Sequence, residues 1–220
     1  MKEIGEIRRM NKKGVIHMLE NSKGIVRRKV IVNMNEVLEN HRDDHLHILY
    51  KYRGLENYTS QLLNYIEDGI VAGDYVVLIE NSRLYPVIQK ELNARLTKEQ
   101  LELIHYVNSM DFYWSSGSYH PPSIAEYFSK TIQSYVENKL SFRAWAHVEW
   151  ASMEEPLHLI KDLEEIVDEA VYSLSFPLIC AYEGEKMPDF LKNSLMETHP
   201  YVLLDDDFII SEQYQSSKTL

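Results

Sequence analysis

The sequence predicts an α/β domain: a mostly parallel sheet with helices on both faces, three layers in all, preceded by a small β-prone arm at the N-terminus. Apolar runs of strand length recur after residue 45, and segments with apolar residues at helical spacing separate them. The run from Asp74 to Ile79 is unbroken and apolar after its aspartate, which is typical of a parallel strand that is buried on both faces. Helical segments between such strands predict right-handed crossovers.

The first 44 residues are predicted to form a basic arm and a connector. Two β-prone runs, Gly14–Leu19 and Ile25–Val32, flank the turn-forming segment Asn21–Gly24, which predicts a short hairpin. Polar and charged residues from 33 to 44 are expected to connect this arm to the body.

The body is predicted to span residues 45–208, followed by a polar tail over residues 209–220. Its strands are expected at His45–Tyr52, Asp74–Ile79, Leu101–Asn108, Phe142–Trp150, Pro177–Tyr182 and Tyr201–Leu204. Its helices are expected at Glu56–Val71, Leu84–Leu92, Pro121–Tyr135, Pro156–Leu174 and Pro188–His199. Prolines suit the first turn of three of these helices, and Gly73 suits a left-handed cap after the first.

Composition indicates an ordinary globular protein. The chain has 220 residues, of which 45% are hydrophobic and 26% are charged, and this length is sufficient to bury a core without cross-links. The single cysteine, Cys180, cannot form an internal disulfide, which favours a reducing compartment. Since no apolar run of about 18 residues is present, we expect a cytoplasmic protein without a membrane partner.

Charge is distributed unevenly along the chain. Residues 1–31 hold nine basic and three acidic side chains, a net charge of +6. Because the whole chain has a net charge of −11, the remaining residues carry −17. A strongly acidic body repels phosphate backbones, so we expect no nucleic-acid binding by the main domain. The arm is expected to contact RNA, DNA or an acidic protein face, or to lie against the acidic body of its own or a neighbouring subunit.

A candidate ligand pocket lies where the strands end. In open α/β sheets ligands bind beyond the carboxyl ends of the strands, and aromatic rings follow four of the five strand ends considered. The alternative is that these rings only cap the sheet. The candidate ligand-binding residues are His47, Tyr50, Tyr113, Trp114, Arg143, Glu149, Trp150 and Tyr182.

Motifs for other chemistry are weak. The loop Glu80–Pro86 after the second strand has no glycine and no Lys-Ser or Lys-Thr pair, which argues against a phosphate-binding loop. His45 and His47 point to one face, but no third metal ligand is identifiable, so neither a metal nor a cofactor is expected. The run Asp205–Asp207 is interpreted as a solvated turn, and Cys180 as a small core residue.

Catalytic arrangements are equally weak. The segment Ser115–Ser118 with His120 lacks the Gly-x-Ser-x-Gly elbow of hydrolases. Glu149 or His47 would be the base of an enzyme, but the sequence indicates no substrate. We therefore expect no catalytic residue.

Several segments together resemble the MEDS domain, the sensory domain of methanogens, methylotrophs and the DcmR regulator. They are His47–Tyr50, Gly69–Asp74, Tyr113–Ser118, Arg143–Trp150, Ile179–Tyr182 and Thr198–Pro200. The resemblance runs from about residue 45 to residue 208. It implies a fold similar to RecA and KaiC without a working nucleotide loop, used as an input domain for small organic molecules in signal transduction and transcription regulation.

The leading interpretation is therefore a non-enzymatic sensory module that binds a small organic ligand and signals through a partner protein or through self-assembly. In it the rings provide apolar contact, His47 and Glu149 orient the ligand, and Arg143 pairs with an acidic group. Two alternatives are a degenerate RecA-like module for assembly without a ligand, and an enzyme that uses Glu149 or His47.

Overall fold

The computed structural model of the chain describes residues 20–21, 24–25, 34–40, 46–148, 157–205 and 207–215. Seven strands make up its main sheet: β3 (His47–Tyr52), β4 (Tyr75–Glu80), β5 (Ile104–Asn108), β6 (Phe142–His147), β7 (Leu178–Glu183), β8 (Tyr201–Leu203) and β9 (Phe208–Ile210). The helices are α1 (Met34–Asn40), α2 (Gly54–Ala72), α3 (Tyr85–Arg95), α4 (Lys98–Leu101), α5 (Ser109–Tyr113), α6 (Pro121–Glu137), α7 (Leu157–Leu174) and α8 (Asp189–Thr198).

The main sheet has the strand order β5-β4-β6-β7-β3-β8-β9. Every neighbouring pair is parallel except β8 with β9. Strand β3 lies inside the sheet, where Leu49 is opposite Cys180 of β7 and Val202 of β8. The predicted mostly parallel sheet is confirmed.

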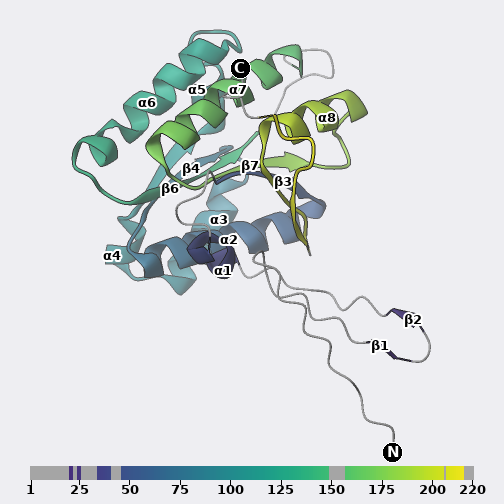
Figure 1. Cartoon of the computed structure of the whole chain (residues 1–220). Helices are drawn as coiled ribbons and strands as arrows, with labels where there is room; N and C mark the ends of the chain where they lie inside the picture. The colour runs from purple at the N-terminus through teal and green to yellow at the C-terminus, as the bar shows by residue number, and fades with distance from the viewer. Residues whose placement is uncertain are drawn as a thin grey trace, which may run out of the picture.

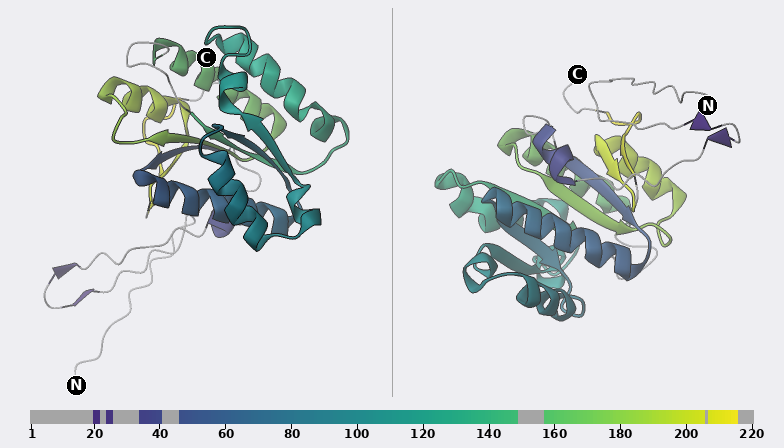
Figure 2. Two further views of the ribbon diagram at one scale, coloured as in Figure 1. Left: turned by 180° about the vertical axis from the view of Figure 1, so that it is seen from behind. Right: turned by 90° about the horizontal axis from the view of Figure 1, so that it is seen from below.

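Helices cover both faces of this sheet, as Figure 1 shows. The connections from β3 to β4 and from β4 to β5 step in one direction along the sheet, whereas those that lead to β6, β7 and β8 step in the other. Right-handed crossovers therefore send α2 to α4 to one face and α5 to α8 to the opposite face. The view from behind in Figure 2 shows α2, in blue, and α6, in teal, on opposite sides of the strands. The three-layer prediction is confirmed.

The sheet divides the core in two, because successive side chains of a strand point to opposite faces. On the side of α5 to α8, Leu49, Ala146 and Cys180 belong to one buried cluster. On the side of α2 to α4, Tyr50 and Trp145 belong to the other. This alternation decides which of the predicted site residues can meet.

Several predicted elements differ from the structure. The strand expected from Leu101 begins only at Ile104, because Thr97 and Gln100 form a capping box that starts the short helix α4. Helix α5 was not predicted, although the Asn108 side chain caps its first turn by accepting hydrogen bonds from two backbone N–H groups.

Both predicted boundaries of the body, at residues 45 and 208, also differ from the structure. The connector expected over residues 33–44 contains helix α1, which packs on α2 through the buried Leu38. The boundary at residue 208 falls inside β9, and Ser211 beyond it donates a hydrogen bond of 2.5 Å to the Met196 carbonyl. In the arm, β1 (Glu20–Asn21) and β2 (Gly24–Ile25) pair antiparallel, while the rest of the predicted hairpin lies outside the described residues.

None of the helices within the described ranges is long and apolar enough to cross a membrane.

Candidate functional site

Two acidic residues on α7 face the sheet instead of solvent. Glu164 and Asp168 are one helical turn apart and are 2% and 5% exposed. The same face of α7 buries Ile160, Leu163 and Val171, whereas Leu174 at the end of the helix is exposed. A buried carboxylate is costly unless it is paired, so the partners of these two acids indicate what the site does.

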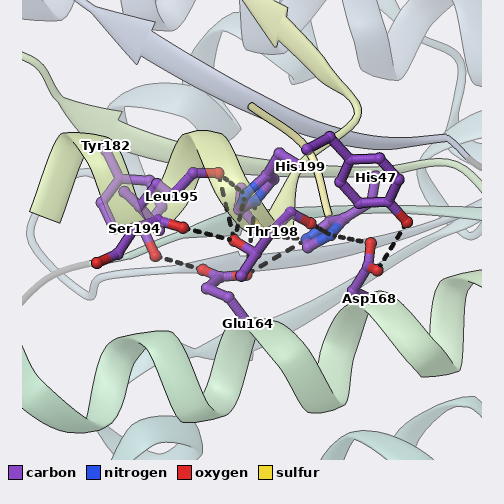
Figure 3. Close-up of polar contacts among 10 residues, drawn as sticks. His47, Glu164, Asp168, Tyr182, Ser194, Leu195, Thr198 and His199 are labelled. Carbon is purple, nitrogen blue, oxygen red and sulfur yellow. Dashed lines mark hydrogen bonds and ion pairs between the residues drawn. The ribbon is translucent and has the colours of Figure 1, made fainter. Parts of the chain in front are cut away.

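Histidines from two other elements meet these carboxylates, as Figure 3 shows. His47, the first residue of β3, lies with Nδ1 3.0 Å from Asp168 and Nε2 3.3 Å from Glu164. His199 follows α8, and its Nε2 lies 3.5 Å from Glu164. The two imidazole rings contact each other, with centroids 3.8 Å apart. Both histidines are fully buried.

Strand β7 adds a thiol and a phenol to this site. Cys180 Sγ lies 3.5 Å from both His47 Nε2 and Glu164 Oε2. The Tyr182 hydroxyl donates a short hydrogen bond to Glu164 Oε1. We call His47, Glu164, Cys180 and His199 the α7 cluster; one ligand atom from each lies within 4.8 Å of those of the other three. The prediction that Cys180 is a small core residue omitted these polar contacts.

The two histidines of the α7 cluster have pKa values that are shifted in opposite directions. Burial alone would lower the pKa of His47, but hydrogen bonds with Asp168 and Glu164 outweigh it and raise that pKa to about 9. Burial and the nearby His47 charge lower the pKa of His199 to about 3. Burial would raise the pKa of Glu164, but His199, His47 and Tyr182 lower it overall. Without a bound ion, His47 is thus protonated, His199 neutral and Glu164 ionised at neutral pH.

The tautomer of His199 follows from its partners. Its Nδ1 lies 2.8 Å from the Leu195 carbonyl oxygen, which can only accept a hydrogen bond. The proton of the neutral ring is therefore on Nδ1, and Nε2 carries a lone pair. That lone pair points at the ionised Glu164 and has no hydrogen-bond partner among the described residues.

An apolar cavity adjoins the α7 cluster. Its volume is about 40 Å³, and it lies between the sheet and helices α5, α6 and α7. Glu164, Cys180 and Tyr113 are the lining residues with polar atoms; the remaining lining residues are Ile79, Phe112, Ile124, Ala125, Phe128, Ala146, Val148, Leu163, Ile166, Val167, Ala170 and Leu178. A water molecule needs about 10–15 Å³ by this measure, so the cavity has room for a molecule of a few heavy atoms.

A second orphaned polar atom lies near the cavity. The hydroxyl of Tyr119 is buried and makes no hydrogen bond with the described residues. Its ring stacks on Tyr113 of the cavity wall at a centroid distance of 5.9 Å. Burial, together with the charges of Glu164 and Cys180, raises the pKa of Tyr119 well above its usual value. The phenol is therefore a donor that lacks an acceptor.

The opposite face of the sheet holds another buried polar group, which is satisfied. Glu80, at the end of β4, accepts hydrogen bonds from the Asn81 backbone N–H, from His147 Nδ1 and from the Tyr58 hydroxyl. The Tyr52 hydroxyl bonds the other ring nitrogen of His147 at 2.9 Å. Since both oxygens of Glu80 have partners, we interpret this group as a structural link between the sheet and α2.

The structure does not bring the eight predicted site residues into one pocket. His47 and Tyr182 bond Glu164, and Tyr113 lines the cavity beside it. Trp114 packs next to them, with its ring 5.8 Å from that of Tyr119.

Two predicted residues face the other side of the sheet. Tyr50 is three positions from His47, so the strand alternation turns it toward α2, where its hydroxyl donates to Asp205. Arg143 lies at the amino end of β6, and its Nε donates to Asp74 at 2.8 Å. The structure therefore does not bring Tyr50 or Arg143 together with His47 on one face of the sheet. Glu149 and Trp150 lie outside the described residues.

Sequence reasoning missed Glu164, Asp168, Tyr119 and His199. Acidic residues on an amphipathic helix are normally solvated, so the pair on α7 did not indicate a site. A signal was present, since Leu163-Glu164 and Val167-Asp168 place acids next to the apolar stripe at a four-residue spacing.

A phosphate-binding loop could follow β3 as well as β4. Strand β3 borders β7, and their following helices α2 and α8 lie on opposite faces, which makes the end of β3 a topological switch point. Its loop, Tyr52-Arg53-Gly54, has one glycine and no following Lys-Ser or Lys-Thr pair. The absence of the motif therefore holds at both positions.

A family model described as MEDS, the methanogen/methylotroph DcmR sensory domain, matches residues 46–200. This match covers most of the chain and includes His47, the acids of α7, Cys180 and His199. The chain belongs to the MEDS family. As a MEDS domain, it has a sensory or regulatory role.

Comparison with solved structures shows a remote likeness of fold. One solved structure, described as an ATPase domain, is similar with a TM-score of 0.46 and 9% sequence identity, over 77% of this chain and 73% of that one. No curated protein matches the chain.

Proposed function

We propose that this MEDS domain is a non-enzymatic sensor that binds a small, largely apolar organic molecule in the cavity beneath α6 and α7. The observation that carries the proposal is the cavity itself. Its wall is almost entirely apolar, and Tyr113, Glu164 and Cys180 are the lining residues that carry a polar atom. An apolar pocket with a few convergent polar groups is typical of small-molecule sites.

The polar groups indicate what such a ligand offers. Ionised Glu164 accepts hydrogen bonds, and the Tyr119 hydroxyl needs an acceptor. A hydroxyl group can donate to Glu164, whereas Tyr119 stacks on Tyr113 and is not itself a lining residue of the cavity. We therefore propose a short-chain alcohol or a related hydrocarbon derivative of a few heavy atoms.

The helices around the cavity provide the path for signalling. Helix α6 packs on α7, and α7 packs on α8. The segment after β9 reaches the same helices, because the Tyr214 hydroxyl donates to Asp168 at 3.0 Å. Ligand that fills the cavity would separate or tighten α6 and α7 and so change the surface offered to a regulatory protein or to a second copy of the chain.

A thermal-shift screen tests binding. Untagged protein is mixed with short-chain alcohols, ketones and halogenated hydrocarbons, with Mg-ATP as a nucleotide comparison. A ligand at a hundred times its dissociation constant stabilises the fold by about 2.7 kcal/mol. This corresponds to an increase in Tm of about 5 to 10 °C for a chain of this size.

A cavity-filling variant identifies the site. Ala125 on α6 lines the cavity and is half-buried, so Ala125→Leu extends a side chain into the space with little overpacking. It should remove the ligand-dependent shift, whereas Ala94→Leu on the exposed face of α3 should keep it. A shift that persists in Ala125→Leu would contradict this location, and a shift with Mg-ATP alone would contradict the proposed ligand class.

The distribution of charge favours a second candidate function, assembly through the arm. Residues 1–31 carry +6 and the remainder −17, so the arm of one chain is attracted to the body of another. Deletion of residues 1–31 should abolish an oligomer without a change in ligand binding if both functions are present. A monomeric full-length protein at low salt would exclude this candidate.

A further inference from the structure

We infer that the α7 cluster, His47, Glu164, Cys180 and His199, is a binding site for a divalent transition metal, Zn²⁺ above all. This inference concerns the polar cluster and does not depend on whether the adjoining cavity binds an organic ligand. The four residues come from separate parts of the fold: strand β3, helix α7, strand β7 and the position directly after α8.

Four of the six distances between donor atoms match tetrahedral coordination, and the two from His199 to His47 and Cys180 lie within 4.8 Å. With zinc bonds of about 2.0–2.1 Å to nitrogen and oxygen and about 2.3 Å to sulfur, tetrahedral donors are separated by about 3.3 Å for nitrogen with oxygen and about 3.5 Å for pairs with sulfur. The distance from His47 Nε2 to Glu164 Oε2 is 3.3 Å, and Cys180 Sγ lies 3.5 Å from each of these atoms. His199 Nε2 lies 3.5 Å from Glu164 Oε2.

The outer contacts also match those of a metal site. Histidines that bind a metal donate their second ring N–H to a carboxylate or a carbonyl, which fixes ring orientation. His47 Nδ1 contacts Asp168 at 3.0 Å, and His199 Nδ1 donates to the Leu195 carbonyl at 2.8 Å. The Tyr182 hydroxyl holds the second oxygen of Glu164. Each imidazole thus directs its Nε2 toward the centre of the cluster.

One nitrogen atom of the cluster, His199 Nε2, has no hydrogen-bond partner among the described residues. This atom is fully buried, and a carboxylate oxygen is its neighbour. A cation placed between these two atoms would bind both. The glutamate of the α2 side, Glu80, shows the contrast, because both of its oxygens have donors.

The donor types select the metal class. Imidazole and thiolate suit zinc and its borderline neighbours, whereas Mg²⁺ and Ca²⁺ prefer oxygen ligands alone. A thiolate from Cys180 and the carboxylate of Glu164 neutralise a dication. Four protein ligands also complete a tetrahedron, which is typical of sites that stabilise a fold rather than of hydrolytic centres with an open position.

Metal titration of the full-length, untagged chain tests the inference. The protein is stripped with a chelator and dialysed against Zn²⁺ or Co²⁺, and bound metal is measured by elemental analysis. We expect one equivalent per chain, and for Co²⁺ we expect the visible bands of a tetrahedral site together with a thiolate charge-transfer band. Less than about a tenth of an equivalent, or octahedral cobalt spectra, would overturn the inference.

Substitution of single residues tests the contribution of each proposed metal ligand. Cys180→Ser should abolish the charge-transfer band, and His199→Ala should prevent stoichiometric binding. Asp168→Asn changes the partner of His47 Nδ1 without removing one of the four donors, and it should weaken affinity about 10- to 100-fold. The control is His120→Ala, an exposed histidine bonded to Ser123 outside the cluster, which should bind metal as the unaltered chain does.

X-ray absorption spectroscopy of the zinc-loaded, unaltered protein tests the site even if the variants do not fold. The expected zinc environment has one sulfur at about 2.3 Å and three lighter donors at about 2.0–2.2 Å. An environment without sulfur would contradict the assignment, as would a Cys180→Ser protein with an unchanged cobalt spectrum.

Discussion

Arg143 was predicted to bind a ligand, but its buried ion pair with Asp74 indicates a structural role, which substitution of Arg143 would test. Its Nε and Nη2 donate to Asp74 Oδ2 at 2.8 and 2.5 Å, and the two side chains are 5% and 12% exposed. Loss of one member of a buried ion pair costs about 3–5 kcal/mol. Asp74 borders a crevice of about 450 Å³ that lets water reach the carboxylate, so we expect about 3 kcal/mol for Arg143→Met, near the lower end of that range.

This loss corresponds to a Tm lower by about 6 to 12 °C. Urea denaturation of four proteins, the unaltered chain, Arg143→Met, Asp74→Leu and the double variant, measures it. The double variant should recover most of the stability, because it leaves no unpaired charge. Ligand or metal binding should be unchanged in the folded Arg143→Met protein. Unchanged stability together with lost ligand binding would refute this argument and return Arg143 to the binding site.

Three further substitutions follow from other contacts. Tyr58→Phe removes a donor from Glu80 and should lower the free energy of unfolding by about 2 to 3 kcal/mol; stability within error of the unaltered protein in urea would show that water replaces the phenol. Gly73→Ala should cost about 1 kcal/mol, since Gly73 has φ 85 with open space around its Cα, and a stabilised variant would contradict the left-handed cap. Tyr214→Phe should cost about 1 kcal/mol and increase amide exchange after β9, because it removes a hydrogen bond to Asp168; unchanged exchange would separate that segment from α7.

The regular elements were predictable because their patterns are local. The apolar run before Glu80 is β4, and the helix before Gly73 ends in the predicted left-handed cap. Strand β9 was missed because its Phe208, Ile209 and Ile210 follow an acidic run and have no alternation. It forms through pairing with β8, a contact between segments that sequence patterns do not report.

The site was predictable only in part, and the reason is tertiary. His47, Tyr113 and Tyr182 were selected as aromatic or polar residues of strands or the loops after them, and all three lie near Glu164. Glu164 itself is acidic on an amphipathic helix, and solvation is the usual state of such a residue. The acid is buried because His47, Tyr182 and His199 approach it from segments that are distant in the sequence.

Methyl NMR tests the cavity claim most directly, because isoleucines report on both faces of the sheet. Ile79, Ile124 and Ile166 line the cavity, whereas Ile66 and Ile88 belong to the core on the α2 side. Titration of isoleucine-δ1-labelled protein with the alcohols, ketones and halogenated hydrocarbons should shift the first three resonances and leave the other two in place. Shifts confined to Ile66 and Ile88, or no saturable shift with any compound, would contradict a ligand site beneath α6 and α7.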